Sequence, residues 1–324
     1  MTSPPSGKLR TTGIPLWYSQ IYTDGLDPEV RFPRLRYRLV REGLESSRAS
    51  GAIHFNDPDP LPVEDLYLAH DPSYVEAFLS GTMDEPTMRR IGLRPWTEKI
   101  SARTLKLTNG TVLAMRHAVE HGGVSGNLGG GTHHAHKDFG SGYCIFNDLA
   151  VAARVAQRDY GLNRVLILDL DVHQGDGTAA IFESDTTVRT ISFHCEKNFP
   201  FRKMKSDLDV EFPPETGDDL YLHKLKDVLQ TEANTFSPEL ILFQAGVDAH
   251  SNDSLGFLNL SHEGLRARNS LVFDFASRLG VPIVITMGGG YGEPIENSIQ
   301  AHVDVFLQAA QYANELDSSP KSSA

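Results

Sequence analysis

Cysteine is scarce in this sequence. The chain has two cysteines in 324 residues, Cys144 and Cys195, and no Cys-x-x-Cys pair. This argues against a disulfide framework and against a structural zinc site built on cysteine. We expect two reduced, buried thiols, because free cysteine packs as a small apolar residue.

Long apolar runs and positive charge are also in short supply. No run approaches the roughly 18 apolar residues of a membrane span, and the start, MTSPPSGKLRTTG, lacks the apolar core of a secretory signal. Lys and Arg number 30 against 42 Asp and Glu, a net charge of −12. General phosphate-backbone binding needs a basic surface, whereas this balance is compatible with a cationic substrate. We expect a cytoplasmic protein with no membrane partner and no direct nucleic-acid partner.

The composition fits one globular domain. The chain is 40% hydrophobic and 22% charged, and α/β folds of this length often form a single domain. Both ends are rich in Ser and Pro, which is typical of frayed termini. We predict a flexible N-terminus at residues 1–12, one domain at residues 13–314 and a flexible C-terminal tail at residues 315–324.

Short β-branched apolar segments alternate with helical stretches. The strand segments are residues 14–19, 164–170, 187–193, 239–246 and 281–290, and the helical stretches lie near residues 34–47, 72–80, 97–121, 146–160, 218–234, 261–279 and 294–314. Ser261 and Gly280 are expected to cap one helix, and Asn147 and Gly161 another. The alternation predicts an α/β fold with an open parallel sheet and helices on both faces.

Acidic and histidine residues follow the predicted strands at their carboxyl ends, where parallel sheets bind ligands. In VLILDLDVHQGDG (165–177), Asp171 and His173 are two residues apart, so an extended chain points both side chains to one side. Asp248 follows the predicted strand at residues 239–246 and would supply a third ligand from a neighbouring strand end. Three ligands with a vacant position are typical of catalytic zinc, although this O,N,O set also suits Fe(II), Mn or Co.

Two adjacent histidines, His133 and His134, follow three glycines in GGGTHH. Adjacent imidazoles do not easily enter one metal shell, but both can face a reacting water and a carbonyl group. Such a histidine needs a partner that fixes its tautomer, and we expect Asp169 and Asp176 each to orient one of them. Tyr291, in MGGGYG, can donate a hydrogen bond to a developing oxyanion.

The segments GGGTHHAHKDFGSGYCIFND, DLDVHQGDGT, QAGVDAHSNDSLGFLNLS and GGGY, in this order and spacing, resemble the zinc-dependent histone deacetylase family. The resemblance covers about residues 14–310, and GDDLYL (217–222) and HEGLRARNSLVFDF are most similar to class IV and bacterial deacetylases. It implies the arginase/deacetylase fold for a catalytic domain at residues 13–314. It also implies one Zn²⁺ per chain, held by Asp171, His173 and Asp248.

The same resemblance implies roles for the residues around the metal. His133 and His134 would be an acid/base pair, His133 paired with Asp169 and His134 with Asp176, and Tyr291 would polarise the substrate carbonyl. An acyl-lysine tunnel would be lined by Gly142, Tyr143 and Phe199, although most relatives carry Phe at the position of Tyr143. A potassium site would use Asp169, Ser192 and Phe193.

Several further residues have candidate or structural roles. The acidic rim residue of some relatives has no clear counterpart, and Asp84 and Glu85 are candidates. The basic run at residues 31–41 is interpreted as a solvated helix face, with Arg34 or Arg36 as a candidate for an acetate exit channel. We expect structural roles for three further histidines, His136, His194 and His250.

The expected activity is hydrolysis of the side-chain amide of acyl-lysine, in proteins or peptides, by metal-activated water. Two alternative enzymes are an acetylpolyamine amidohydrolase and a long-chain fatty-acyl-lysine deacylase. A binuclear manganese enzyme of the arginase type is disfavoured because DVHQGD lacks the extra ligands for a second metal. A pseudoenzyme that only binds acyl-lysine is disfavoured because every ligand, histidine and tyrosine is present. Acyl length, oligomeric state and zinc versus iron stay open.

Overall fold

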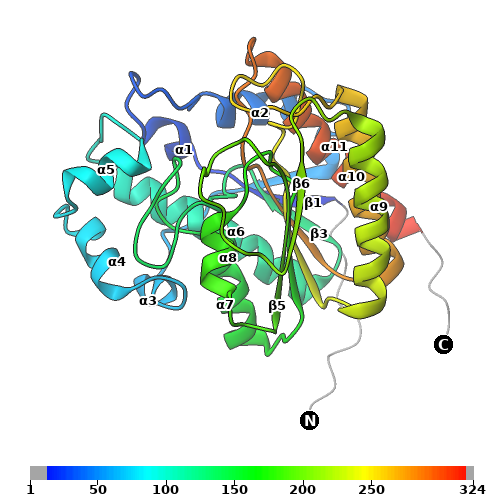
Figure 1. The fold of residues 1–324 in the computed structure, drawn as a ribbon, viewed down its shortest axis with the longest axis horizontal. Helices are drawn as coiled ribbons and strands as arrows, with labels where there is room; N and C mark the ends of the chain where they lie inside the picture. The colour runs from blue at the N-terminus through cyan, green and yellow to red at the C-terminus, as the bar shows by residue number, and fades with distance from the viewer. Residues whose placement is uncertain (1–12, 319–324) are drawn as a thin grey trace.

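The fold is a three-layer α/β arrangement around one sheet. The computed structural model describes residues 13–318, so the predicted flexible segment at residues 1–12 lies outside the described residues. Helices cover both faces of the sheet, with α6, α7 and α8 on one side and α9, α10 and α11 on the other (Figure 1). This is the predicted single-sheet architecture, and it agrees with the arginase/deacetylase fold.

The sheet has eight strands, and all of its pairings are parallel. The order is β2-β1-β3-β8-β7-β4-β5-β6. The strands are β1 Ile14–Trp17, β2 Ile53–Asn56, β3 Val124–Asn127, β4 Val165–Asp169, β5 Val188–Cys195, β6 Leu208–Phe212, β7 Leu240–Gln244 and β8 Ile283–Thr286. Strands β3, β4, β7 and β8 are buried along their whole length, because helices cover both of their faces.

Eleven α-helices and one 3₁₀ turn are present among residues 13–318. The helices are α1 Ile21–Asp24, α2 Arg36–Glu45, α3 Val63–Leu66, α4 Pro72–Leu79, α5 Glu85–Ile91, α6 Ile100–His121, α7 Asp148–Tyr160, α8 Asp176–Phe182, α9 Asp218–Thr235, α10 His262–Leu279 and α11 Glu296–Ser318, and the 3₁₀ turn is Ser50–Ala52. No helix in this described range combines the length and the apolar character needed to cross a bilayer.

Local sequence signals explain two of the helices well. Ser261 accepts a hydrogen bond from the backbone N–H of Gly264, and Asn147 does the same for Ala150. The helices end at Gly280 and Gly161, whose φ values of 63° and 66° are left-handed. The predicted caps of α10 and α7 are therefore confirmed.

The sequence predictions missed three strands and misplaced one boundary. β3 reads VSGN, and β6 reads LDVEF with only its last residue buried, so neither has the continuous apolar run of the strands that were predicted. Edge strand β2 was missed as well. Helix α11 runs to Ser318 and so enters the predicted tail at residues 315–324, because Leu316 packs against the core.

Four neighbouring strands in the middle of the sheet, β3, β8, β7 and β4, carry the polar clusters seen in the sequence. Because all strands are parallel, their carboxyl ends lie at the same edge of the sheet. The loops after these strands therefore converge, although they are up to 160 residues apart in the chain. The central strands of the sheet therefore position the site.

Both cysteines are buried and unpaired, as predicted.

His70 connects the segment between α3 and α4 to the segment between β3 and α7. Its Nδ1 lies 2.9 Å from the carbonyl oxygen of His136, and its Nε2 accepts a hydrogen bond of 2.9 Å from the backbone N–H of Asn147. Both contacts together require a neutral ring with its proton on Nδ1. Burial lowers the pKa of His70 from 6.5 to about 4.

This depressed pKa predicts a loss of stability in mild acid. The neutral ring stabilises the fold fully above pH 6.5, and the contribution is lost as the pH falls from 6.5 toward 4. We expect His70 alone to cost about 2 kcal/mol of unfolding free energy between pH 7 and pH 5. Urea unfolding of the wild type and of His70→Gln at both pH values measures this, because glutamine keeps a donor and an acceptor but does not titrate. Equal pH dependence in the two proteins would contradict it.

Candidate metal centre and active site

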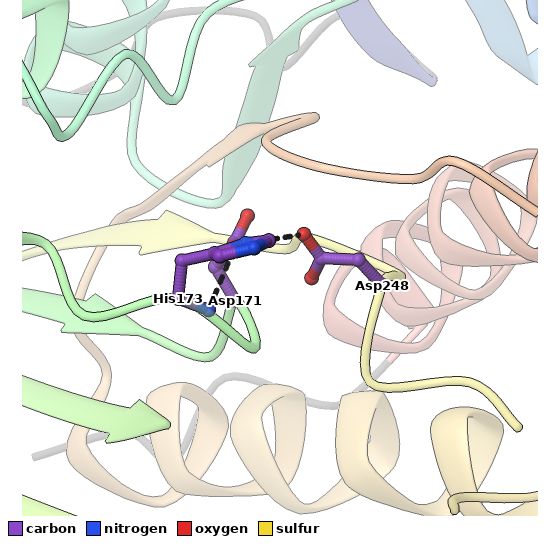
Figure 2. Close-up of side chains that lie close together, drawn as sticks. All are labelled: Asp171, His173 and Asp248. Carbon is purple, nitrogen blue, oxygen red and sulfur yellow. Dashed lines mark hydrogen bonds and ion pairs between the residues drawn. The ribbon is translucent and has the colours of Figure 1, made fainter. Parts of the chain in front are cut away.

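Three side chains meet at the carboxyl ends of β4 and β7. Asp171 and His173 come from the loop after β4, and Asp248 comes from the loop after β7 (Figure 2). His173 Nδ1 lies 3.0 Å from Asp171 Oδ1 and 3.2 Å from Asp248 Oδ2. One ligand atom from each residue lies within 4.8 Å of the other two, and all three residues are buried. The three predicted ligands therefore face a common point.

Hydrogen bonds from two loops and from the end of β7 hold the two carboxylates in place. Asp171 Oδ2 accepts from the backbone N–H of Gly289 at 2.7 Å and from Gln244 Nε2 at 2.8 Å. Asp248 Oδ1 accepts from the backbone N–H of Val172 at 2.9 Å. The remaining oxygens are directed toward His173, so each carboxylate is oriented by the protein and presents a ligand atom to the shared centre.

Two glycines make room for the carboxylates. A Cβ atom at Gly289 would lie 1.8 Å from Asp248 Oδ2, and one at Gly246 would lie 2.4 Å from Asp171 Oδ2. Either contact is far below the van der Waals limit. The glycines after β7 and β8 therefore let the backbone pass directly against the ligand group.

The electrostatics of the cluster favour a bound cation. Burial, together with the neighbouring charge of Asp171, raises the pKa of Asp248 to about 7. Burial lowers the pKa of His173, but Asp171 and Asp248 outweigh it and raise that pKa to about 10. Two buried carboxylates this close repel each other unless a positive charge lies between them. Their O,N,O donor set suits a divalent transition metal, so the residues present fit such an ion.

The adjacent histidines lie next to this cluster, each on a carboxylate. His133 Nδ1 is 2.6 Å from Asp169 Oδ2, and His134 Nδ1 is 2.7 Å from Asp176 Oδ1. The two rings are 4.1 Å apart between centroids. Asp176 also contacts Nε2 of His136 at 3.0 Å. Nδ1 of each ring is thus engaged, and Nε2 of His133 lies 3.9 Å from Asp171 Oδ1, toward the ligand cluster.

The surroundings give the two imidazoles different basicities. Burial lowers the pKa of His133, but the charges of Asp169 and Asp171 outweigh it and raise it to about 9. Burial and the neighbouring charge of His133 lower the pKa of His134 to about 4, against the opposing effect of Asp176. Pairs of groups with separated pKa values are typical of sites that need both an acid and a base.

Tyr291 lines the same cavity as the predicted ligands and is held through its backbone. Its N–H donates to Asp253 Oδ2 at 2.6 Å, and its carbonyl accepts from Ser254 Oγ at 2.7 Å. Burial raises the pKa of the Tyr291 phenol well above 10, so the group carries its proton at neutral pH. Asp253 was not singled out from the sequence, and its only signal is its place five residues after the ligand Asp248.

One cavity of about 460 Å³ reaches from the predicted ligands to the adjacent histidines and Tyr291. Gly142, Tyr143 and Phe199 line it together with the three ligands, the two histidines and Tyr291. The Phe199 ring lies edge-on to His134, with centroids 4.9 Å apart. A Cβ at Gly142 would lie 2.6 Å from the His134 ring, so a side chain there would displace that histidine.

The basic run at residues 31–41 is not wholly a solvated face. Arg36 is buried, and its guanidinium donates to the carbonyls of Gly288 at 2.7 Å and Gly290 at 3.0 Å. It also lies 5.4 Å from the centroid of the Tyr291 ring. The expectation was wrong for this residue because the glycine turn leaves carbonyl oxygens that need a buried donor. Arg36 lines the cavity, whereas Arg34 does not.

Arg268 on α10 is a second buried cation, and sequence reasoning missed it. Its guanidinium donates to the carbonyls of Gly246 at 2.5 Å and Leu170 at 3.3 Å. These carbonyls lie just before the ligands Asp171 and Asp248, so Arg268 connects the two ligand-bearing loops from behind. The pattern of apolar and polar residues along an amphipathic helix does not distinguish a buried arginine from an exposed one, so the burial of Arg268 could not be predicted.

The predicted potassium residues lie next to the site, but Ser192 has another partner. Asp169 and Ser192 are register partners on β4 and β5. Ser192 Oγ is 2.9 Å from His194 Nδ1, and the Phe193 ring packs against Phe212 with centroids 5.9 Å apart. The potassium site therefore stays a prediction.

Three other candidates lie away from the cavity wall. Asp84 caps α5 by accepting from the N–H of Thr87, and Glu85 is bound by Arg94 at 2.6 Å. His250 accepts from a neighbouring backbone N–H. None of the three candidates is among the described residues that line the cavity. Both carboxylates have partners within or beside α5, and the acidic-rim role of Asp84 and Glu85 stays a prediction.

Hydrolases of the arginase/deacetylase fold are the class that this strand order and carboxyl-edge site define. The family model of the histone deacetylase domain matches residues 30–306, and the chain therefore belongs to the histone deacetylase family. The class IV assignment within that family stays a prediction.

Three relatives illustrate the family. The chain is 41% identical over 290 residues to an uncharacterized protein of Picosynechococcus sp., covering 90% of this chain and 96% of that protein. It is 30% identical over 279 residues to the acetoin utilization protein AcuC of Staphylococcus aureus, covering 80% and 72% of the two chains. A histone deacetylase-like amidohydrolase of Pseudomonas aeruginosa is 29% identical over 273 residues, covering 79% and 71%.

The ligand geometry predicts which substitutions remove the metal. We expect Asp171→Ala and Asp248→Ala to lose bound metal, because each removes one of three ligands. His133→Ala and His134→Ala should keep it, since their imidazoles bind carboxylates outside the cluster. Elemental analysis of protein dialysed against a slight excess of Zn²⁺ measures the metal per chain. Metal-free histidine variants would mean that the two groups of residues have been confused.

Proposed function

We propose that the chain is a zinc-dependent hydrolase that removes acetyl groups from the side-chain amide of lysine in proteins. The observation that carries this is the joint placement of three metal ligands, two carboxylate-bound histidines and a phenol on one cavity. Amide hydrolysis needs an activated water, a proton acceptor and donor, and stabilisation of an oxyanion. This cavity has a candidate group for each of them.

Asp171, His173 and Asp248 would hold one zinc ion. When bound, zinc supplies a Lewis acid for the amide carbonyl and makes a coordinated water more acidic. Iron(II) would suit the same donors, so zinc rests on the family resemblance and on the three-ligand arrangement. The protein contributes the fixed carboxylates, the buried position and the glycine backbone that leaves space beside them.

The histidines move the protons. Because both Nδ1 atoms face aspartates, Nε2 of each ring is the atom that reaches the substrate. One imidazole accepts a proton from the attacking water as the new C–O bond forms. When the C–N bond breaks, an imidazole returns a proton to the leaving lysine amine, so the products are a carboxylate and a free amine.

Tyr291 and the aromatic walls act on the substrate directly. The phenol donates a hydrogen bond to the oxygen that becomes negative during attack, which its retained proton allows. Phe199 and Tyr143 present ring surfaces in the cavity and would pack along the aliphatic part of the lysine side chain. The aromatic contact holds the amide near the histidines.

The acyl end of the cavity favours a short group. Buried Arg36 and Arg103 line the cavity together with Tyr37, and we take the part that these two guanidinium groups border as the acyl end. A carboxylate product is attracted to such a surface, whereas a long alkyl chain would have to displace charged groups from their hydrogen bonds. Acetyl is therefore preferred over a long fatty acyl chain in this proposal.

Removing the phenol separates chemistry from metal binding. Tyr291→Phe should keep its metal and lose about 10²–10³-fold in kcat, because one oxyanion donor is lost while the aromatic ring remains. Turnover of an acetyl-lysine peptide, with metal content measured on the same sample, tests this. Tyr160→Phe, whose hydroxyl bonds Glu120 on the surface, is the matched control. Normal kcat in Tyr291→Phe would overturn the assignment.

The acyl preference is tested with a series of acetyl-, octanoyl- and myristoyl-lysine peptides of one sequence. We expect kcat/KM to fall along the series by at least tenfold from acetyl to myristoyl, and expect turnover to stop after chelation and return with Zn²⁺. Higher kcat/KM for the myristoyl peptide would favour the long-chain deacylase instead.

A further inference from the structure

Three large apolar side chains are exposed around the outer end of the active-site cavity. We call Phe201, Leu255 and Phe257 the apolar rim. Their exposed fractions are 92%, 42% and 48%, and they are three of the six large apolar side chains that are exposed among the described residues. All three line the cavity that contains the metal ligands. Clustered exposure of this kind marks a binding surface more often than single exposed residues do.

The apolar rim is fixed from below by Asn198, which is buried between its two loops. Asn198 Nδ2 donates to the carbonyl of Leu255 at 2.5 Å, and Oδ1 accepts from the N–H of Phe257 at 3.0 Å. One buried amide thus joins the loop that carries Phe201 to the loop that carries Leu255 and Phe257. The relative placement of the three apolar side chains is set before any ligand binds.

Each loop also has its own internal support. Lys203 Nζ donates to the carbonyls of Asn198 and Pro200, both at 2.7 Å, which holds the segment just before Phe201. Asp253 Oδ1 accepts from the N–H groups of Leu255 and Gly256, both at 2.9 Å. These bonds support the backbone from which the three exposed apolar side chains project. The apolar rim is exposed and so available to a partner.

The charges on the cavity wall argue against a polyamine. Asp171 and Asp248 are the only carboxylates among the described residues that line it, and both are metal ligands. Arg90 and Lys197 are exposed lining residues and are positive. A polyamine carries further ammonium groups beyond its acetylated end, and these would face cations and apolar surface without a counter-charge.

We propose that the apolar rim binds a large apolar side chain of a polypeptide, next to the acylated lysine. The substrate class is then an acyl-lysine protein segment with Leu, Phe or Met beside the modified residue. This inference rests on the proposed function, since the lysine must enter the cavity for its neighbour to reach the apolar rim. When the flanking side chain packs against Phe201, Leu255 and Phe257, its apolar surface is removed from water, and this favours binding.

The test compares two acetyl-lysine peptides that differ only beside the lysine, one with Leu and one with Gly, plus N-acetylspermidine. With zinc-loaded protein, we expect kcat/KM to be about tenfold higher for the Leu peptide than for the Gly peptide, and lowest for the polyamine. In Phe201→Ser this preference ratio should fall to about one to three. Phe201 is almost fully exposed, so its replacement leaves the core intact.

The matched control is Leu220→Ser, which removes an exposed apolar side chain on α9 that is not part of the cavity wall. It should keep the wild-type ratio. An equal kcat/KM for the two peptides in the wild type, or an unchanged ratio in Phe201→Ser, overturns the proposal. Faster turnover of N-acetylspermidine overturns it as well and identifies a polyamine enzyme.

A binding measurement separates this proposal from the proposed function. Fluorescence anisotropy of the two labelled peptides with Tyr291→Phe protein reads affinity without turnover. If no acyl-lysine compound is hydrolysed by the wild type but the Leu peptide still binds about tenfold tighter, the hydrolase proposal fails and the apolar rim stands. If both peptides are hydrolysed and bind with equal affinity, the hydrolase stands and the apolar rim fails.

Discussion

The burial of negative charge at the end of β4 is the constraint on which the rest of the site depends. Asp169, Asp171 and Asp248 all lie inside the protein, where isolated carboxylates are strongly disfavoured. His133 and His173 offset part of that charge, and Arg268 adds a buried cation behind the ligand loops. The remaining negative charge lies where the ligand atoms of Asp171, His173 and Asp248 meet. A divalent ion bound there would neutralise it.

The parts of the fold and of the site that could be predicted from the sequence are those with a local sequence pattern. The strands that carry Asp171 and Asp248 are continuous apolar runs, so their ends, and hence the ligands, could be placed without coordinates. The short strand β3, with its Ser and Gly, has no such pattern. Arg36 and Arg268 could not be placed either, because what buries them is a set of carbonyl oxygens left free by turns that are distant in sequence.

The glycines of the site show a second limit of the sequence. Their number before the histidines and before Tyr291 indicated that backbone passes close to something, and the family resemblance placed a metal nearby. The structure gives the reason at Gly289, which borders Asp248, and adds two glycines outside those runs: Gly246 borders Asp171, and Gly142 borders His134. These positions require glycine because a Cβ atom would not fit beside the neighbouring side chain, and not only because glycine has a freer backbone.

In the proposed function, catalysis and selectivity lie in different parts of one cavity, and Asp253 contacts both parts. The floor depends on buried charges that tolerate little change, whereas the apolar rim consists of exposed side chains on supported loops. One carboxylate oxygen of Asp253 orders the loop of Leu255, and the other accepts from the backbone N–H of Tyr291. A polypeptide that presses on the apolar rim therefore contacts the loop that positions the phenol. Side chains at the apolar rim can change with the substrate while Asp253 keeps the phenol in place.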